Sequence, residues 1–84
     1  MNVTQHPNMK KLILTGTYAQ YRDWLVLHNA NPRAALYIHR PDQFCGMDPE
    51  QVEIVLGDCY WDNPAYMSTE YLHIKWRQNH QIAI

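Results

Sequence analysis

Six residues that follow predicted strands carry the side chains and backbone groups that bind anions. They are Gly16, Thr17, Tyr18, His39, Arg40 and Asp58. A glycine before a helix leaves backbone N–H groups free at the positive end of the helix dipole, and an arginine adds a charge that suits phosphate. In an open parallel sheet, ligands bind beyond the carboxyl ends of the strands. The pattern predicts a cleft for a nucleotide or another phosphate-bearing ligand at that edge.

The complete phosphate-binding motifs do not occur in the chain. The sequence contains neither G-x-G-x-x-G nor G-x-x-x-x-G-K-[ST], so Gly16 stands alone. A strand, a glycine turn and a helix cap are also ordinary parts of any βα unit. In the plainer interpretation Thr17 only caps a helix, Arg40 is solvated and Asp58 caps a turn. Both interpretations are open at the level of sequence.

Few residues at this edge are of types that could catalyse a reaction. His39 and Asp58 form an acid–base pair only if the fold makes them neighbours. No serine or cysteine stands in a nucleophile elbow, and Cys45 and Cys59 have neither C-x-x-C nor zinc-ligand spacing. We therefore expect a protein without enzymatic activity, cofactor or metal site. The two cysteines are expected to be reduced.

Five aromatic residues gather in the last third of the chain and indicate a different kind of binding. They are Tyr60, Trp61, Tyr66, Tyr71 and Trp76. Tyrosine and tryptophan are enriched among the residues that dominate the energy of protein interfaces. A chain of 84 residues buries only a modest fraction of its surface, so these rings cannot all lie deep in a core. The cluster predicts a partner-binding surface, and half-buried support of the core is the alternative.

The elements that position these residues form a small α/β domain. Apolar runs predict strands at about 10–15, 34–39 and 51–56, separated by a helix at about 18–29 and a short helical turn at 41–47. Strands that alternate with helical crossovers predict a parallel sheet. We expect a three-stranded, Rossmann-like sheet with flanking helices. The unbroken run Leu12-Ile13-Leu14 is typical of a strand covered on both faces.

The first helix has a clear start signal and a clear inward face. Thr17-x-x-Gln20 matches a capping box, which predicts that the helix begins directly after Thr17. Spacing of i, i+3, i+4 and i+7 predicts an inward face of Tyr21, Trp24, Leu25 and His28. On that face, His28 is expected to be a hydrogen-bonded core histidine.

A final helix is predicted over about residues 64–78. Asn63 resembles its N-cap, and Pro64 suits the first helical position. Residues 72–76 also alternate in polarity, so an amphipathic strand is the competing interpretation. The helix is favoured because β-branched residues are few and because it completes the alternating order.

The organisation of the chain is that of one domain. Residues 10–78 form it, residues 1–9 are a flexible arm and residues 79–84 a tail. A formal charge of −1 argues against general nucleic-acid binding, which needs a basic face. No apolar run is long enough for a membrane span or a signal core, so we expect a cytoplasmic protein. An open sheet this small is also expected to cover an edge with a partner or a second copy.

Four short patterns carry a resemblance to known proteins. They are Leu12-Ile13-Leu14-Thr15-Gly16-Thr17-Tyr18, Tyr21-Arg22-Asp23-Trp24-Leu25, Asn31-Pro32-Arg33 and Val52-Glu53-Ile54-Val55-Leu56-Gly57-Asp58. Over roughly residues 10–65 the chain resembles small uncharacterised proteins encoded by bacteriophages of actinobacteria. The resemblance implies a phage accessory protein that binds and modulates a host protein in the host cytoplasm. It assigns no active-site residue.

A second likeness involves the turn before the third predicted strand. Pro41-Asp42-Gln43-Phe44-Cys45-Gly46 looks like the segment before the acidic strand in phage terminase-type ATPases. Those ATPases have a phosphate-binding lysine motif, which this chain lacks. The likeness therefore does not extend to ATP hydrolysis.

Overall fold

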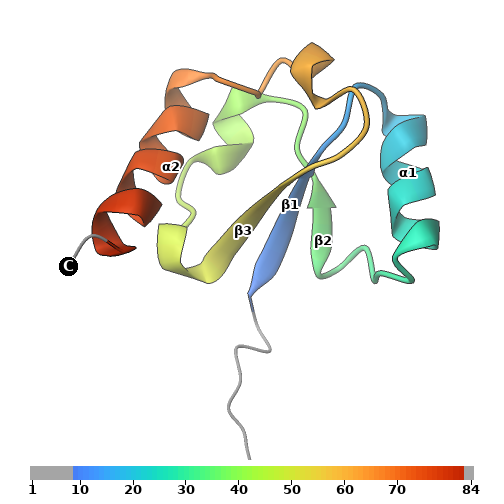
Figure 1. Ribbon diagram of the computed structural model, residues 1–84, viewed down its shortest axis with the longest axis horizontal. Helices are drawn as coiled ribbons and strands as arrows, with labels where there is room; N and C mark the ends of the chain where they lie inside the picture. The colour runs from blue at the N-terminus through green and yellow to red at the C-terminus, as the bar shows by residue number, and fades with distance from the viewer. Residues whose placement is uncertain (1–8, 83–84) are drawn as a thin grey trace, which may run out of the picture.

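The computed structural model describes residues 9–82, with side chains through Asn79. Over these residues the chain forms a three-stranded parallel sheet, two α-helices and three short 3-10 helices (Figure 1). The strands are β1 (Lys10–Leu14), β2 (Ala35–Tyr37) and β3 (Val52–Leu56), and the helices are α1 (Tyr18–Leu27) and α2 (Thr69–Ile82). The 3-10 helices are η1 (Pro41–Phe44), η2 (Pro49–Gln51) and η3 (Tyr60–Asp62). The predicted small α/β fold with a three-stranded parallel sheet is confirmed. The predicted arm falls almost wholly outside the described residues.

The sheet has the order β2-β1-β3, so β1 lies in the centre. Lys11 is in register with Ala35 of β2 and with Glu53 of β3. Neighbours on both sides and layers on both faces leave Leu12, Ile13 and Leu14 with no exposed surface. This burial explains why β1 reads as an unbroken apolar run and not as an alternating one.

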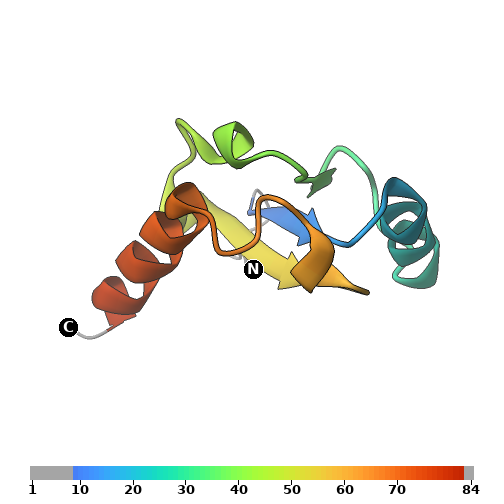
Figure 2. The same ribbon diagram turned by 90° about the horizontal axis from the view of Figure 1, so that it is seen from above.

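Each face of the sheet has its own apolar layer. On one face, Ile13 packs with Tyr21 of α1 and with Ala35. On the other face, Leu12 and Leu14 pack with side chains from η1 and α2, among them Phe44 and Ile74. Figure 2 shows α1 on one side of the sheet, with η1, η2 and α2 on the other. Phe44 of η1 is buried in this second layer, with 3% of its surface exposed.

The start of α1 follows the prediction, and its inward face does so in part. The Thr17 hydroxyl accepts from the backbone N–H of Gln20 at 3.2 Å, and the Gln20 side chain accepts from the Thr17 N–H at 3.0 Å. Asn29 ends the helix with a φ of 50°, a conformation that asparagine tolerates. His28, predicted to lie in the core, is exposed and stacks on Trp24 with ring centroids 4.1 Å apart. His28 is the C-cap residue, one position beyond the last helical residue, so its ring lies in solvent against Trp24. The predicted hydrogen bond is present, because Nδ1 lies 3.0 Å from the Trp24 carbonyl oxygen.

The start of α2 differs from the prediction. The helix runs from Thr69 to Ile82, not from 64 to 78, so the strand alternative is also wrong. The Ser68 hydroxyl, and not Asn63, accepts from the first turn, at 3.1 Å from the Tyr71 nitrogen. Met67 just before it has a φ of 62°, which interrupts any helix begun at Pro64. Residues 79–82, predicted as tail, continue the helix.

Two buried tyrosines make the folded protein less stable at alkaline pH. Tyr21 donates its hydroxyl proton to the Ala35 carbonyl at 2.6 Å, and Tyr71 lies in the opposite layer. Burial raises the pKa of Tyr21 above 10.0, with a smaller contribution from Tyr18. Burial likewise raises the pKa of Tyr71, with smaller contributions from Tyr66 and Tyr60. Above pH 10 the folded protein therefore holds protons that the unfolded chain releases.

We predict that the free energy of unfolding falls as the pH rises above about 10, the unfolded tyrosine value. Urea unfolding followed by tryptophan fluorescence between pH 8 and 11 measures this fall. Replacing both buried tyrosines, Tyr21→Phe with Tyr71→Phe, flattens the alkaline part of the profile. Tyr18→Phe is the control, because Tyr18 is exposed and makes only the smaller contribution to the raised pKa of Tyr21, so most of the fall should remain. A profile unchanged in the double variant would contradict the assignment.

Candidate functional site

The carboxyl ends of the three strands meet at one edge, which is here called the rim. The Gly16 N–H donates to the Asp58 carbonyl at 2.9 Å, and the Gly57 N–H donates to the Leu14 carbonyl at 2.8 Å. These bonds hold the segment after β1 against the segment after β3. The rim thus brings Gly16 and Asp58 together, as the sequence predicts from the parallel topology.

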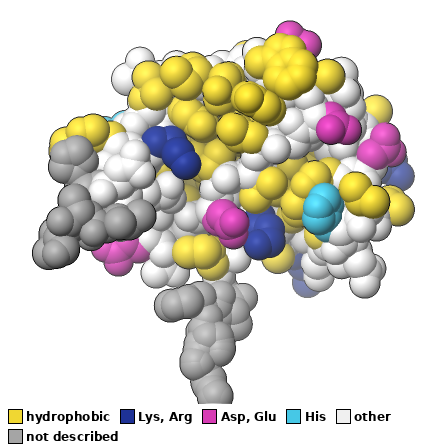
Figure 3. Space-filling view, viewed as in Figure 1, with side chains coloured by type: hydrophobic (Ala, Val, Ile, Leu, Met, Phe, Trp, Pro, Cys, Tyr) yellow, Lys and Arg dark blue, Asp and Glu magenta, His cyan; other side chains and the backbone are white. Residues whose placement is uncertain are grey.

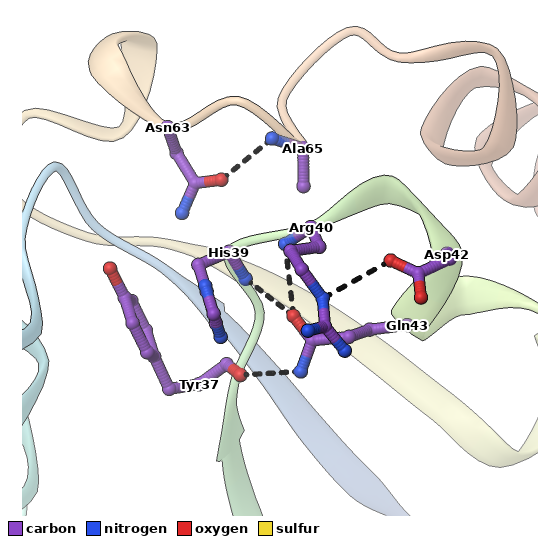
Figure 4. Close-up of polar contacts among 7 residues, drawn as sticks. All are labelled: Tyr37, His39, Arg40, Asp42, Gln43, Asn63 and Ala65. Atoms are coloured by element: carbon purple, nitrogen blue, oxygen red, sulfur yellow. Dashed lines mark hydrogen bonds and ion pairs between the residues drawn. The ribbon is translucent and has the colours of Figure 1, made fainter.

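A buried asparagine closes the other half of the rim. The side-chain amide of Asn63 donates to the Thr15 carbonyl at 2.9 Å and to the Ile38 carbonyl at 2.7 Å. Its carbonyl oxygen accepts from the Ala65 N–H at 2.8 Å (Figure 4). Asn63 is only 3% exposed. One side chain therefore joins the ends of β1 and β2 to the segment that leads to α2, a role that its sequence position did not reveal.

The contacts of Gly16 are with the chain itself. A Cβ built on Gly16 would lie 2.8 Å from the Cβ of Cys59 and 2.9 Å from its carbonyl oxygen. The same Cβ would lie 2.9 Å from the Gln20 side-chain oxygen. Position 16 requires glycine because the segment after β3 crosses directly over it. The capping box of Thr17 and Gln20 also occupies the adjacent helix start.

His39 and Arg40 are fixed by their own turn (Figure 4). Their backbone N–H groups donate to the Gln43 side-chain oxygen at 2.8 Å and 2.9 Å. The Arg40 guanidinium pairs with Asp42 at 3.2 Å, and both side chains are more than half exposed. The His39 ring stacks on Tyr37 at 5.0 Å with an interplanar angle of 11°. The charge of Arg40 is thus partly balanced inside the turn that carries it.

Three hollows on the described surface lie next to the rim or away from it, and none spans it. A groove of about 440 Å³ between α1 and β3 is lined by Trp24, Leu27, Val55 and Asp58, among others. A smaller hollow of about 330 Å³ along α1 includes Tyr18. A third, of about 360 Å³, lies between α2 and the segment containing η1 and η2. The six predicted rim residues therefore do not share any one of these hollows. Binding of a phosphate-bearing ligand at the rim stays a prediction.

Four of the five residues of the predicted aromatic cluster form a continuous chain of rings. Trp61 contacts Tyr60 with centroids 5.1 Å apart, and Tyr60 contacts Tyr66 at 4.9 Å. Tyr66 contacts Tyr71 at 5.3 Å, and Tyr71 reaches Phe44 in the core at 6.2 Å. The chain of rings runs from solvent to the interior. Tyr71 belongs to the core, whereas the rings before it support an exposed end.

The exposed end continues into an apolar area over η3 and the start of α2. Trp61 is 63% exposed, and Trp76 is 57% exposed one helical turn after the exposed Leu72. Figure 3 shows hydrophobic side chains merging into one area over this part of the molecule. We use the name aromatic surface for the exposed and half-buried apolar residues of η3, of the segment after it and of α2, which are Tyr60, Trp61, Tyr66, Met67, Leu72 and Trp76. Met67 and Leu72, which the sequence did not single out, could have been found only from their exposure.

Other kinds of site find little support within residues 9–82. No group of three or more His, Cys, Asp or Glu side chains in this part of the chain could hold a metal ion. The thiols of Cys45, which is exposed, and of Cys59, which is half-buried, form no disulfide in this structure. None of the helices described is both long and apolar enough to cross a membrane. No protein family, curated protein or solved structure matches this chain.

We predict that Asn63→Ala lowers the free energy of unfolding by roughly 2–4 kcal/mol, because two buried carbonyl groups lose their donor. Asn31→Ala is the control, since Asn31 is exposed and accepts one local bond from the Arg33 N–H. Chemical denaturation at pH 7 measures both. Equal losses in the two variants would show that the Asn63 bonds contribute nothing special.

At pH 7, Asn63→Asp should lower the free energy of unfolding more than Asn63→Ala does, because a carboxylate there faces two carbonyl oxygens and donates to neither. That environment would raise the pKa of the new carboxyl, so the folded variant binds a proton more readily than its unfolded chain. Its stability relative to the wild type therefore recovers as the pH falls toward about 4. Unfolding curves between pH 4 and 7 test this, and a deficit independent of pH would contradict it.

Proposed function

We propose that this chain is a non-enzymatic binding protein that docks on another protein through the aromatic surface. The observation that carries the proposal is the exposure of Trp61, 63%, at the outer end of the chain of rings, together with the exposure of Met67, Leu72 and Trp76. Soluble proteins seldom leave large rings gathered in solvent unless that surface meets a partner. Tryptophan and tyrosine are also the side chains that most often dominate the energy of such interfaces.

The ring contacts support the proposal because they hold the surface in place before binding. Trp61 rests on Tyr60, and Tyr60 rests on Tyr66, which is anchored through Tyr71. A preorganised aromatic side chain loses less conformational entropy on binding than a freely rotating one. The half-buried rings therefore have two roles in this proposal. They support the core, and they hold Trp61 exposed for a partner.

The nature of the partner follows from the resemblance to actinobacteriophage proteins. A phage accessory protein acts on the proteins of its host, so the partner is sought in the proteome of an actinobacterial host. The formal charge of −1 and the apolar character of the surface favour a protein partner over nucleic acid.

The proposal predicts that Trp61→Ala weakens partner binding by about 30-fold or more, the loss expected for an interface hot spot. A displayed library of host protein fragments identifies the binder, and calorimetry measures the affinities. Tyr18→Ala is the matched control, because Tyr18 is an exposed ring at 57% that lies outside the aromatic surface. Circular dichroism confirms that each variant is folded. If Trp61→Ala and Tyr18→Ala weakened partner binding equally, Trp61 would not be the hot spot of the interface.

Met67 links the stability of the domain to its binding. Its φ of 62° is a left-handed conformation, which costs a residue with a Cβ about 1 kcal/mol more than it costs glycine. Yet Met67 is exposed within the aromatic surface, where its side chain contributes no core packing. Strain of this kind is retained where a side chain serves binding.

Met67→Gly is therefore predicted to raise the free energy of unfolding by up to about 1 kcal/mol and to weaken partner binding. Denaturation and calorimetry on the same samples give both values. A variant that is less stable and binds at full strength would contradict both halves of the prediction.

A further inference from the structure

Strand β3 has one side that no other strand covers. The sheet order β2-β1-β3 makes β3 an edge strand. The Gly57 N–H donates to the Leu14 carbonyl, so the alternating residues Val55 and Glu53 also turn their backbone groups toward β1. Ile54 and Leu56 therefore turn their backbone N–H and C=O groups outward. Within residues 9–82 no hydrogen bond reaches these outward groups.

The other edge of the sheet, formed by β2, has less room for a partner strand. Strand β2 has only three residues, and the Gln43 side chain donates to its Tyr37 carbonyl at 3.2 Å. Strand β3 has five residues, Val-Glu-Ile-Val-Leu, with no proline or lysine and an unbroken register with β1. An apolar edge with free backbone groups is a template for pairing with another strand.

The free part of the β3 edge is short and sharply bounded. At its start, the Gln78 side chain of α2 donates to the Val52 carbonyl at 3.0 Å and to the Pro49 carbonyl at 2.9 Å. At its end, Gly57 and Asp58 turn into the rim. The outward groups left for a partner are thus those of Ile54 and Leu56.

We propose that β3 pairs with β3 of a second copy of this chain, antiparallel about a two-fold axis at Val55. The two three-stranded sheets then form one six-stranded sheet. In this register Ile54 of each copy lies opposite Leu56 of the other, and each such pair exchanges two backbone hydrogen bonds. A two-fold axis relates identical strands in the antiparallel sense, so the interface is closed and self-complementary.

The neighbouring registers fit less well. An axis at Ile54 would set Leu56 opposite Val52, whose carbonyl already accepts from Gln78. An axis at Leu56 would set Ile54 opposite Asp58, which brings a carboxylate into the apolar seam. The axis at Val55 satisfies the outward groups of Ile54 and Leu56 in both copies. Val52, whose carbonyl is already bonded, then lies at the end of the pairing, opposite Asp58 of the other copy, where that chain turns into the rim.

The side chains along this register are also compatible. Glu53 lies opposite Gly57, so no like charges meet across the seam, and the Lys11–Glu53 ion pair at 3.2 Å is undisturbed. On one face Leu56, 40% exposed, gains the neighbouring Ile54 as an apolar contact. On the other face, the Val55 side chains of the two copies lie opposite each other, beside the groove lined by Trp24 and Leu27. The aromatic surface is not required for this contact, so the dimer is independent of the proposed function.

Sedimentation equilibrium of the full chain over a range of concentrations tests the dimer. Val55→Lys places like charges directly opposite at the axis and is expected to weaken association by roughly tenfold or more. Val26→Lys is the matched control, since Val26 is 81% exposed on the outer side of α1. A wild-type chain that remains monomeric throughout overturns the proposal, and so does equal association of the two variants.

A cross-link provides a second test that does not depend on how well Val55→Lys folds. Val55 would be a non-hydrogen-bonded pair across the axis, where Cα atoms lie about 4.5 Å apart, within reach of a disulfide. In a Cys45→Ser background, Val55→Cys should form a covalent dimer under mild oxidation much faster than Val26→Cys. Peptide mapping must place the bond between the two position-55 side chains. Equal rates, or a bond elsewhere, overturn the register.

Discussion

The amide of Asn63 is the contact on which the arrangement of this domain depends. It donates to the carbonyl groups at the ends of β1 and β2 and accepts from the Ala65 N–H. Backbone groups at the ends of buried strands need partners, and water cannot supply them here because Thr15, Ile38 and Asn63 are all buried. A side chain with two donors and one acceptor in use meets this need. The requirement fixes where the chain runs after β3.

That path has consequences for function. Because the segment from Cys59 to Ala65 passes over the rim, Gly16 contacts Cys59 and not an open cleft. The same segment lifts η3 above the sheet and sets Trp61 in solvent, backed by Tyr60 and Tyr66. The edge where α/β proteins usually bind small ligands is thus lined here by the chain itself, and the exposed apolar area lies beside it.

The two proposed contacts use different chemistry and different elements. The aromatic surface offers side chains from η3 and α2, whereas the β3 edge offers the backbone groups of Ile54 and Leu56. A dimer through β3 would carry two aromatic surfaces in one assembly. Two linked binding sites raise the effective affinity for a partner that presents two copies of its own surface. The small size of the domain favours both contacts, since so short a chain leaves much apolar surface uncovered.

The sequence by itself determined the parallel three-stranded sheet, the start of α1 and the burial of β1. These features depend on local signals: the run Leu12-Ile13-Leu14, and the pairing of Thr17 with Gln20 three residues later. Much of the aromatic cluster was also visible, because four rings that lie close in the sequence after β3, those of Tyr60, Trp61, Tyr66 and Tyr71, are also in contact in space. Local patterns are reliable where the forces that produce them act between near neighbours.

Only the tertiary structure decided the role of Asn63, the start of α2 and the exposure of His28. Asn63 before Pro64 has the local form of a helix cap, yet its partners lie 48 and 25 residues away at Thr15 and Ile38. The Asn63 NH2 group binds those distant carbonyl groups while its oxygen accepts from the Ala65 N–H, and the left-handed φ of Met67 ends this local turn. The helix therefore begins at Thr69 after the Ser68 cap. Which rings are core and which are surface was likewise set by the packing of α2 on η1 and η2, which buries Tyr71 and leaves Trp76 exposed. Long-range contacts outweigh local preference in each case, because burying a carbonyl group or an aromatic ring changes the free energy more than a helix cap does.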